Sequence, residues 1–223
     1  MVYNIAIDGP AGAGKSTIAK RVAKELSFVY VDTGAMYRAM AYYLLQQNVN
    51  GSDPEAIAAV CQGAEISIEY RNGEQIVLLN GENVNAYLRT EEVGNMASVS
   101  SANPRVRARL LDLQRGLAAS QSVVMDGRDI GTTILPDADV KIYLTASSST
   151  RAGRRYKELL EKGEACNIEE IQKDIEERDR RDMSREVSPL RQAEDAVLVD
   201  SSDMSIDEVV SALIKIFHEK TGN

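Results

Sequence analysis

A glycine-rich segment near the N-terminus constrains the fold more than any other part of the chain. Residues 9–16 have the sequence GPAGAGKS, which fits the pattern G-x-x-x-x-G-K-[ST]. An apolar run precedes this segment and a helical pattern follows it. The glycines allow backbone N–H groups to surround an anion, and the N-terminus of the following helix faces that anion. The segment therefore predicts a P-loop, which binds a nucleoside triphosphate at a strand–helix junction.

The polar residues of this loop have expected partners. The Lys15 ammonium reaches the terminal phosphates, and the Ser16 hydroxyl suits Mg²⁺ coordination. Asp126, at the end of a later apolar run, is a candidate for holding Mg²⁺ through water, but Asp8 has a similar position and a strand-end Asp often only caps a loop. The residues of the segment that we expect to bind ATP are Gly9, Pro10, Ala11, Gly12, Ala13, Gly14, Lys15, Ser16 and Thr17.

Strand and helix patterns alternate along most of the chain. Apolar runs predict strands at residues 3–7, 28–31, 122–126, 140–144 and 196–199. Helical patterns cover residues 16–26, 35–47, 54–62, 89–117 (broken at Pro104), 151–162 and 168–181. A capping box formed by Ser205 and Glu208 begins a final helix. We expect a three-layer α/β/α P-loop fold with a five-stranded parallel sheet.

The middle of the chain has a different pattern. Residues 65–70 alternate between apolar and polar side chains, and residues 76–79 are apolar. The pair Asn72-Gly73 between them is a strong hairpin signal. Asn80-Gly81 predicts a turn into a third short strand near Val84. This segment is expected to be a small β insert on the main fold.

The charge balance argues against a broad nucleic-acid-binding surface. The 223 residues suit one domain and carry a net charge of −8. The 26 cations nevertheless comprise 17 arginines and 9 lysines, and arginine grips phosphate through two bonds. The arginines gather at residues 105–109, 151–155 and 178–185. We expect a small anionic ligand and no polynucleotide partner.

Cysteine usage and hydropathy point to a cytoplasmic protein. Cys61 and Cys166 lie far apart without partners at metal-ligand spacing, which favours a reducing compartment. The N-terminus lacks the pattern of a signal peptide, and no apolar stretch approaches the roughly 20 residues of a membrane span. We expect no membrane contact, and a monomer because no exposed apolar stripe demands a partner.

Several motifs in order give the chain a family resemblance. They are IDGP at residues 7–10, DTGAMYR at 32–38, Ser98 with PRVR at 104–107, DGRDIGT at 126–132 and ERDRRD at 177–182. With these motifs the whole chain resembles the bacterial cytidylate kinase family. Thr33 stands where that family often has serine, which keeps the hydroxyl. The resemblance implies transfer of a phosphoryl group from ATP to CMP or dCMP, with Mg²⁺ accompanying ATP.

The resemblance implies that Ser98, Arg107 and Asp129 surround the pyrimidine base. Cytosine presents an amino donor at N4 and acceptors at N3 and O2. A carboxylate facing position 4 favours cytosine and repels the O4 of uracil, and an arginine donor suits N3 and O2. A mispaired buried polar group costs about 1–3 kcal/mol, which is enough for a clear preference. Asp129 has the alternative of a helix cap or a structural salt bridge.

The remaining site residues are also implied by the resemblance. Thr33 lies near the pyrimidine nucleotide and Asp182 takes the sugar hydroxyls. The acceptor phosphate is held by Arg38, Arg128, Arg178 and Arg185, and the catalytic residues are Lys15, Arg128, Arg178 and Arg185. Arg178, Asp182 and Arg185 share one helix face, for which a salt-bridge ladder is the alternative.

The resemblance further divides the single domain, residues 1–223, into regions. The monophosphate-binding region covers about residues 33–120, including a β insert at about 64–86. A short helical lid covers about 151–180 and closes over ATP, and within it Arg154 contacts the nucleotide.

Two other functions are compatible with the P-loop. One is a kinase of a different small anionic acceptor, such as another monophosphate or shikimate. The other is a nucleotide-binding switch without useful catalysis. The chain lacks the N-K-x-D element of a regulatory GTPase, and a switch has no need of a second cluster of phosphate-binding arginines.

Overall fold

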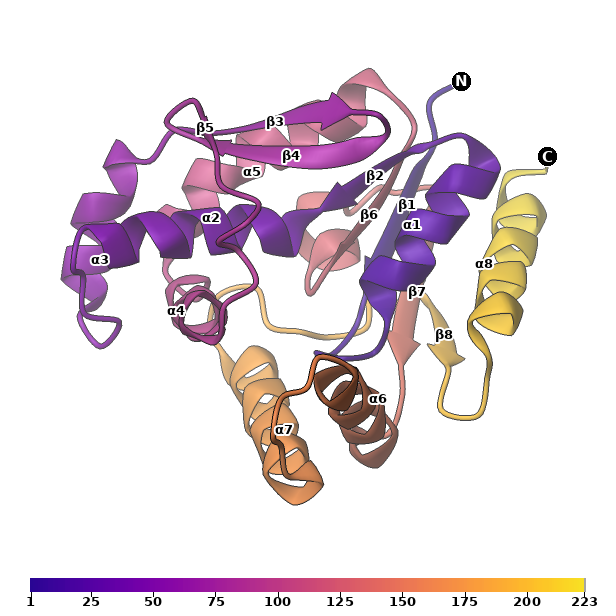
Figure 1. Cartoon of the computed structure of the whole chain (residues 1–223). Helices are drawn as coiled ribbons and strands as arrows, with labels where there is room; N and C mark the ends of the chain where they lie inside the picture. The colour runs from indigo at the N-terminus through magenta and orange to yellow at the C-terminus, as the bar shows by residue number, and fades with distance from the viewer. Residues whose placement is uncertain (223) are drawn as a thin grey trace.

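The computed structural model describes residues 1–222, and its centre is the predicted five-stranded parallel sheet (Figure 1). The strands stand in the order β2-β6-β1-β7-β8, and every neighbouring pair is parallel. Their bounds are β1 Asn4–Asp8, β2 Val29–Asp32, β6 Val123–Gly127, β7 Val140–Thr145 and β8 Val197–Asp200. Because all five run the same way, their carboxyl ends meet at one edge of the sheet, where α/β folds bind ligands.

Helices cover both faces of the sheet and confirm the three-layer expectation. On one face lie α1 (Lys15–Leu26) and α8 (Ile206–Thr221), whose apolar side chains pack against β1, β7 and β8. On the other face, α2 (Thr33–Gln46) and α5 (Pro104–Ser120) pack against β1, β2 and β6. The predicted capping box of α8, between Ser205 and Glu208, is present.

The predicted β insert forms a separate three-stranded antiparallel sheet. Its strands are β3 (Ile66–Arg71), β4 (Glu74–Leu79) and β5 (Glu82–Asn83). The turn at Asn72-Gly73 has positive φ at both residues, 54° and 79°, as a tight hairpin requires. The third strand lies just before Val84, which is itself buried in the core. The cluster of buried side chains that contains Val84 also includes residues of α2 and of the elements around the insert, which are α3 (Pro54–Val60), η1 (Cys61–Gly63) and α4 (Glu91–Ser100).

Two charged helices form a hairpin at the lower side of the molecule in Figure 1. They are α6 (Ser148–Glu161) and α7 (Ile168–Ser184), and they pack side by side. The side chains of Ser147 and Asn167 cap their N-termini. The hairpin occupies the segment expected to be the lid. None of the helices in residues 1–222 is long and apolar enough to cross a membrane.

One element has no counterpart in the sequence prediction. A single π-helical turn, η2 (Ile130–Ile134), follows β6. The Asp8 carboxylate accepts hydrogen bonds from the N–H groups of Ile130 (2.7 Å) and Gly131 (2.8 Å) at its start. Because a residue more than 120 positions away holds this turn, local periodicity could not indicate it.

Candidate two-nucleotide site

The predicted P-loop connects β1 to α1, and its backbone requires glycine at defined points. Gly12 and Gly14 have φ values of 75° and 84°, in the left-handed region that favours glycine. Gly9 has a φ of 151°, and a Cβ atom added there would lie 1.9 Å from the carbonyl oxygen of Leu144. The close approach to β7 therefore explains the first glycine, and the backbone conformation explains the other two.

Lys15 is buried at the start of α1 and bends back over the loop. Its Nζ donates to the carbonyl oxygens of Gly9 and Pro10, both at 2.8 Å. Burial, and next the nearby positive charge of Arg128, lower the pKa of Lys15 below its ordinary value. An anion bound beside this ammonium group would restore its preference for the charged form.

Ser16 and Asp126 are brought together, as the sequence prediction requires. Ser16 Oγ donates to one carboxylate oxygen of Asp126 at 3.0 Å, and the Tyr30 hydroxyl donates to the other at 2.8 Å. Burial, followed by the negative charge of Asp32, raises the pKa of Asp126 to about 6. Two hard oxygen groups beside the P-loop suit Mg²⁺. The other candidate, Asp8, has both oxygens engaged by the backbone of η2, so its place is structural.

Arg107 and Asp129, two of the three predicted base-reading residues, form a buried ion pair. Arg107 also donates to the carbonyl oxygen of Ser101 at 3.2 Å and lies over the Tyr37 ring at 5.5 Å from its centroid. Arg185 Nη2 lies 3.7 Å from the second oxygen of Asp129. The Asp129 side chain does not cap η2, so the alternative of a helix cap is wrong.

Ser98 lies in α4, one turn before the connection that Arg107 contacts. Its backbone carbonyl accepts a hydrogen bond from Ser101 Oγ at 3.1 Å, and Ser101 in turn accepts from Arg107. The Ser98 hydroxyl is buried and has no hydrogen-bond partner within residues 1–222. It is therefore available to a ligand.

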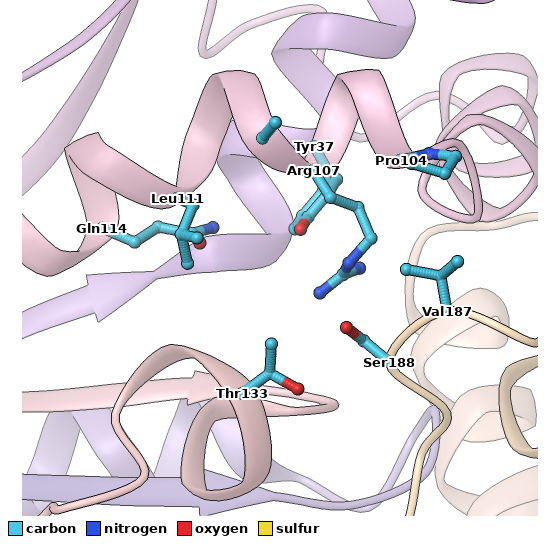
Figure 2. Close-up of a pocket in the computed structure, with 9 residues that line it drawn as sticks. Tyr37, Pro104, Arg107, Leu111, Gln114, Thr133, Val187 and Ser188 are labelled. Atoms are coloured by element: carbon cyan, nitrogen blue, oxygen red, sulfur yellow. The ribbon is translucent and has the colours of Figure 1, made fainter.

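A cavity of about 210 Å³ borders Arg107 on the side of α5 and η2. Figure 2 shows the Arg107 guanidinium pointing from α5 into the space between Thr133 and Ser188, with Leu111 and Gln114 farther along the helix. The cavity leaves space on this side of the guanidinium. This leaves Arg107 room to change its position.

Arg128 lies near Lys15, and Arg38 and Arg178 lie near Arg128, whereas Arg185 lies beside Asp129. Arg128 Nε donates to Asp182 at 2.9 Å. Burial lowers the pKa of Arg178 to about 10, and the nearby charges of Arg128, Arg38 and Arg181 contribute in the same direction. Arg178 Nε is buried and finds no hydrogen-bond partner in the part of the chain that the structure describes. Clustered cations with unused donors are the arrangement that a phosphate dianion stabilises.

Three predicted residues have contacts that differ from their expected roles. The Thr33 hydroxyl donates to the backbone oxygen of Asp126 at 2.7 Å, and so braces β6. Arg154 donates to the backbone oxygen of Ser201 at 2.7 Å, beyond the end of β8. Asp182, expected at the sugar, is paired with Arg128. These contacts hold each of the three side chains in place within the protein.

The sequence prediction missed two residues that organise the site. Tyr30 orients Asp126, and Arg151 links the P-loop to α7. Tyr30 belongs to β2, and its contact depends on β6 lying beside β2, which the order of strands along the chain does not reveal. Arg151 belongs to an arginine-rich run from which the resemblance singled out Arg154 instead. The contacts of Arg151 with the P-loop and α7 become visible only in the fold.

Comparison with solved structures supports the fold alone. The chain superposes on a gluconokinase from Sinorhizobium meliloti with a TM-score of 0.52 and 13% identity, covering 99% of this chain and 94% of that one. An uncharacterized protein from Eubacterium ventriosum gives a TM-score of 0.53 at 13% identity, with 98% and 99% covered.

Sequence comparison identifies the family. The cytidylate kinase model matches residues 5–219. A cytidylate kinase from Lactiplantibacillus plantarum is 50% identical over 216 residues, covering 97% of this chain and 95% of that protein. Another, from Caldicellulosiruptor saccharolyticus, is 46% identical over 220 residues, covering 99% and 97%. The family model and these relatives show that the chain belongs to the cytidylate kinase family.

Proposed function

We propose that this protein transfers the γ-phosphoryl group of ATP to CMP and dCMP, giving CDP or dCDP and ADP. The observation that carries the proposal is the second cation cluster, formed by Arg38, Arg128 and Arg178, beside Lys15 of the P-loop. One loop provides for the donor phosphates, and the cluster provides for an acceptor phosphate. The cytidylate kinases from two bacteria match nearly the whole chain, which supports this acceptor.

The cytosine ring binds beside Ser98, Arg107 and Asp129 in this proposal. The Asp129 carboxylate accepts from the N4 amino group, and Arg107 donates to O2 and N3. Before the base binds, each of these two groups neutralises the other, which avoids the cost of an unpaired buried charge. The cavity beside Arg107 gives its guanidinium room to turn toward the ring. Uracil would place its O4 against the carboxylate.

The reaction requires alignment and charge neutralisation more than covalent chemistry. The phosphate oxygen of CMP is already nucleophilic, so no general base is needed. Lys15, Arg128, Arg178 and Arg185 neutralise the negative charge that develops between the two nucleotides. Asp182 positions the sugar and holds Arg128 by its ion pair.

Ser16 and Asp126 would hold Mg²⁺, which supplies charge neutralisation at the ATP phosphates when bound. The α6–α7 hairpin acts as the lid over ATP, where Arg154 contacts the nucleotide, and residues 33–120 hold the monophosphate. We further propose that the protein works as a monomer in the cytoplasm, where ATP and nucleoside monophosphates are available.

A coupled assay of ADP release over a panel of acceptors tests the function. The panel contains CMP, dCMP, UMP, AMP, GMP and shikimate, each with ATP and Mg²⁺. We expect CMP and dCMP to give the highest kcat/KM. A different best acceptor contradicts the specificity, and tight ATP binding without acceptor-dependent ADP release supports the switch instead.

A further inference from the structure

Arg151 differs from Arg178 and Arg185 because each of its three guanidinium nitrogens has a partner within the protein. Nε donates to the carbonyl oxygen of Ala146 at 2.9 Å, and Nη1 donates to that of Ala11 at 2.8 Å. Nη2 pairs with an Asp179 oxygen at 2.6 Å. By contrast, Arg178 Nε and Arg185 Nη2 have no hydrogen-bond partner among the described residues. Arg151 therefore joins parts of the protein, whereas those two arginines have donors available to a ligand.

The contact with Ala11 fixes one peptide group of the P-loop. Because a trans peptide is planar, a carbonyl of Ala11 held toward Arg151 turns the N–H of Gly12 away from it. P-loops bind phosphate through such N–H groups. Arg151 also packs closely here, since a Cβ added to Gly12 would lie 3.4 Å from its Cβ. The Arg151 guanidinium therefore helps to set the orientation of the Gly12 N–H, on the side of the site that would bind the phosphates of ATP.

The contact with Asp179 reaches the acceptor side. Asp179 stands in α7, next to Arg178 and one turn before Asp182. The side chains of Arg151 and Asp179 are only 6% and 12% exposed, so solvent weakens the pair little. The second oxygen of Asp179 is buried and finds no hydrogen-bond partner in residues 1–222. Because Asp179 is paired with Arg151, a shift of α7 on acceptor binding would move the partner of the Arg151 guanidinium.

We propose that Arg151 is a positioning residue that couples ATP binding to CMP binding by joining the Ala11 peptide of the P-loop to Asp179 of α7. The inference rests on the two-nucleotide site proposed above. Binding of CMP to Arg178 and Asp182 sets the position of α7. Because Arg151 contacts both Asp179 of α7 and the Ala11 carbonyl, a change in that position changes the orientation of the Ala11–Gly12 peptide in the P-loop. By thermodynamic reciprocity, ATP must change the affinity for CMP by the same factor as CMP changes that for ATP.

Calorimetric titration tests the coupling without turnover. The dissociation constant of CMP is measured with and without a non-hydrolysable ATP analogue and Mg²⁺, and the reverse titration is done as a check. We expect the wild-type protein to show a coupling factor of at least about fivefold, and Asp179→Asn and Arg151→Lys to reduce it below about twofold. Either variant that remains folded is sufficient, because each breaks the same link.

The exposed ion pair of Arg155 and Glu158 on the same helix provides matched controls. Arg155→Lys and Glu158→Gln should keep the wild-type coupling factor. The proposal is overturned if Asp179→Asn keeps the wild-type coupling factor. It is also overturned if Arg151→Lys weakens binding of the ATP analogue and Asp179→Asn does not, because Arg151 would then contact the nucleotide directly. Wild-type binding of both ligands without coupling refutes this inference alone, whereas absence of CMP binding refutes the proposed function as well.

Discussion

Asp126 shows how burial sets the chemistry of a single carboxylate. It is 5% exposed, at the end of a central strand, and its two oxygens accept from the hydroxyls of Ser16 and Tyr30. Its pKa is raised to about 6, mainly by burial, whereas an unfolded aspartate titrates near 3.8. Between these two pH values the folded protein holds a proton that the unfolded chain has released.

Replacing Asp126 with Asn should therefore change how stability depends on pH. As the pH rises from about 4 to about 7, the wild-type protein loses stability from this group, because the charged carboxylate is disfavoured in the folded state. The ligand-free Asp126→Asn variant should gain up to about 3 kcal/mol relative to wild type over this range. Denaturant unfolding at several pH values measures the difference.

Asp200 provides a control, because its pKa is shifted in the opposite direction from the pKa of Asp126. It is fully exposed, and its hydrogen bonds with Ser202 lower its pKa. Asp200→Asn should lose stability relative to wild type as the pH rises toward about 4 to 5, and the difference should then stay constant up to about 7. A difference between Asp126→Asn and wild type that does not change with pH would contradict the assigned pKa.

Two P-loop glycines give a matched pair of substitutions. A Cβ at Gly9 meets the Leu144 carbonyl, whereas a Cβ at Gly14 meets nothing within 4 Å. Gly14→Ala should cost about 1–2 kcal/mol of stability from backbone strain alone. Gly9→Ala should cost more than about 3 kcal/mol, because a strand backbone cannot move aside easily. Thermal unfolding of the ligand-free variants measures both, and equal effects would contradict the assignment.

At the scale of elements, two side chains of the β insert, Tyr70 and Gln75, form hydrogen bonds with the backbone of β2 in the main sheet. Gln75 of β4 accepts from the backbone N–H of Asp32 at 2.9 Å and donates to its carbonyl at 3.1 Å. Asp32 in turn caps α2 by accepting from the N–H of Ala35. The insert is therefore tied to the start of the helix that carries Thr33 and Arg38.

Gln75→Ala should loosen this attachment. We expect a loss of about 1–2 kcal/mol in the free energy of unfolding, because two hydrogen bonds to half-buried backbone are removed. The KM for CMP should rise severalfold with a smaller change in kcat, because the substitution would disturb the position of Arg38 in α2. Unfolding curves and steady-state kinetics measure both. Glu74→Ala, an exposed neighbour in the same strand, should change neither value, and an equal effect of both would contradict this role.

The elements themselves were predictable because their signals are local. The P-loop, the hairpin turn at Asn72-Gly73 and the capping box of Ser205 and Glu208 each depend on neighbouring residues, and all are present. The strand order and the π-helical turn were not predictable, since contacts between distant residues create them. For the same reason, motifs brought Arg107 and Asp129 to attention, but not the link made by Arg151.

At the scale of the whole molecule, the distribution of charge separates two tasks. The net charge is −8, yet Arg38 of α2, Arg178 of α7 and Arg128, in the connection after β6, lie near one another. The ion pair of Arg107 and Asp129 lies beside Arg185. In this account, phosphate binding serves any monophosphate, and the discrimination between bases depends on Asp129.

Arg38 is the better phosphate-binding residue for testing this division. Arg185 Nη2 lies 3.7 Å from Asp129, so its removal would also disturb the base-reading pair. Arg38 instead lies near Arg178, and its positive charge contributes to lowering the pKa of Arg178. Losing a hydrogen bond to a charged group costs about 1.5–3 kcal/mol, or roughly 10- to 150-fold in kcat/KM.

The measurement that tests the central claim most directly is the ratio of kcat/KM for CMP to that for UMP in wild type, Asp129→Ala and Arg38→Ala. We expect Asp129→Ala to lower this ratio by roughly 5- to 150-fold, from the loss of about 1–3 kcal/mol of discrimination. Arg38→Ala should lower kcat/KM for both acceptors and leave the ratio within about twofold of wild type. If both variants lower activity with CMP and UMP equally, the division between base reading and phosphate binding is wrong.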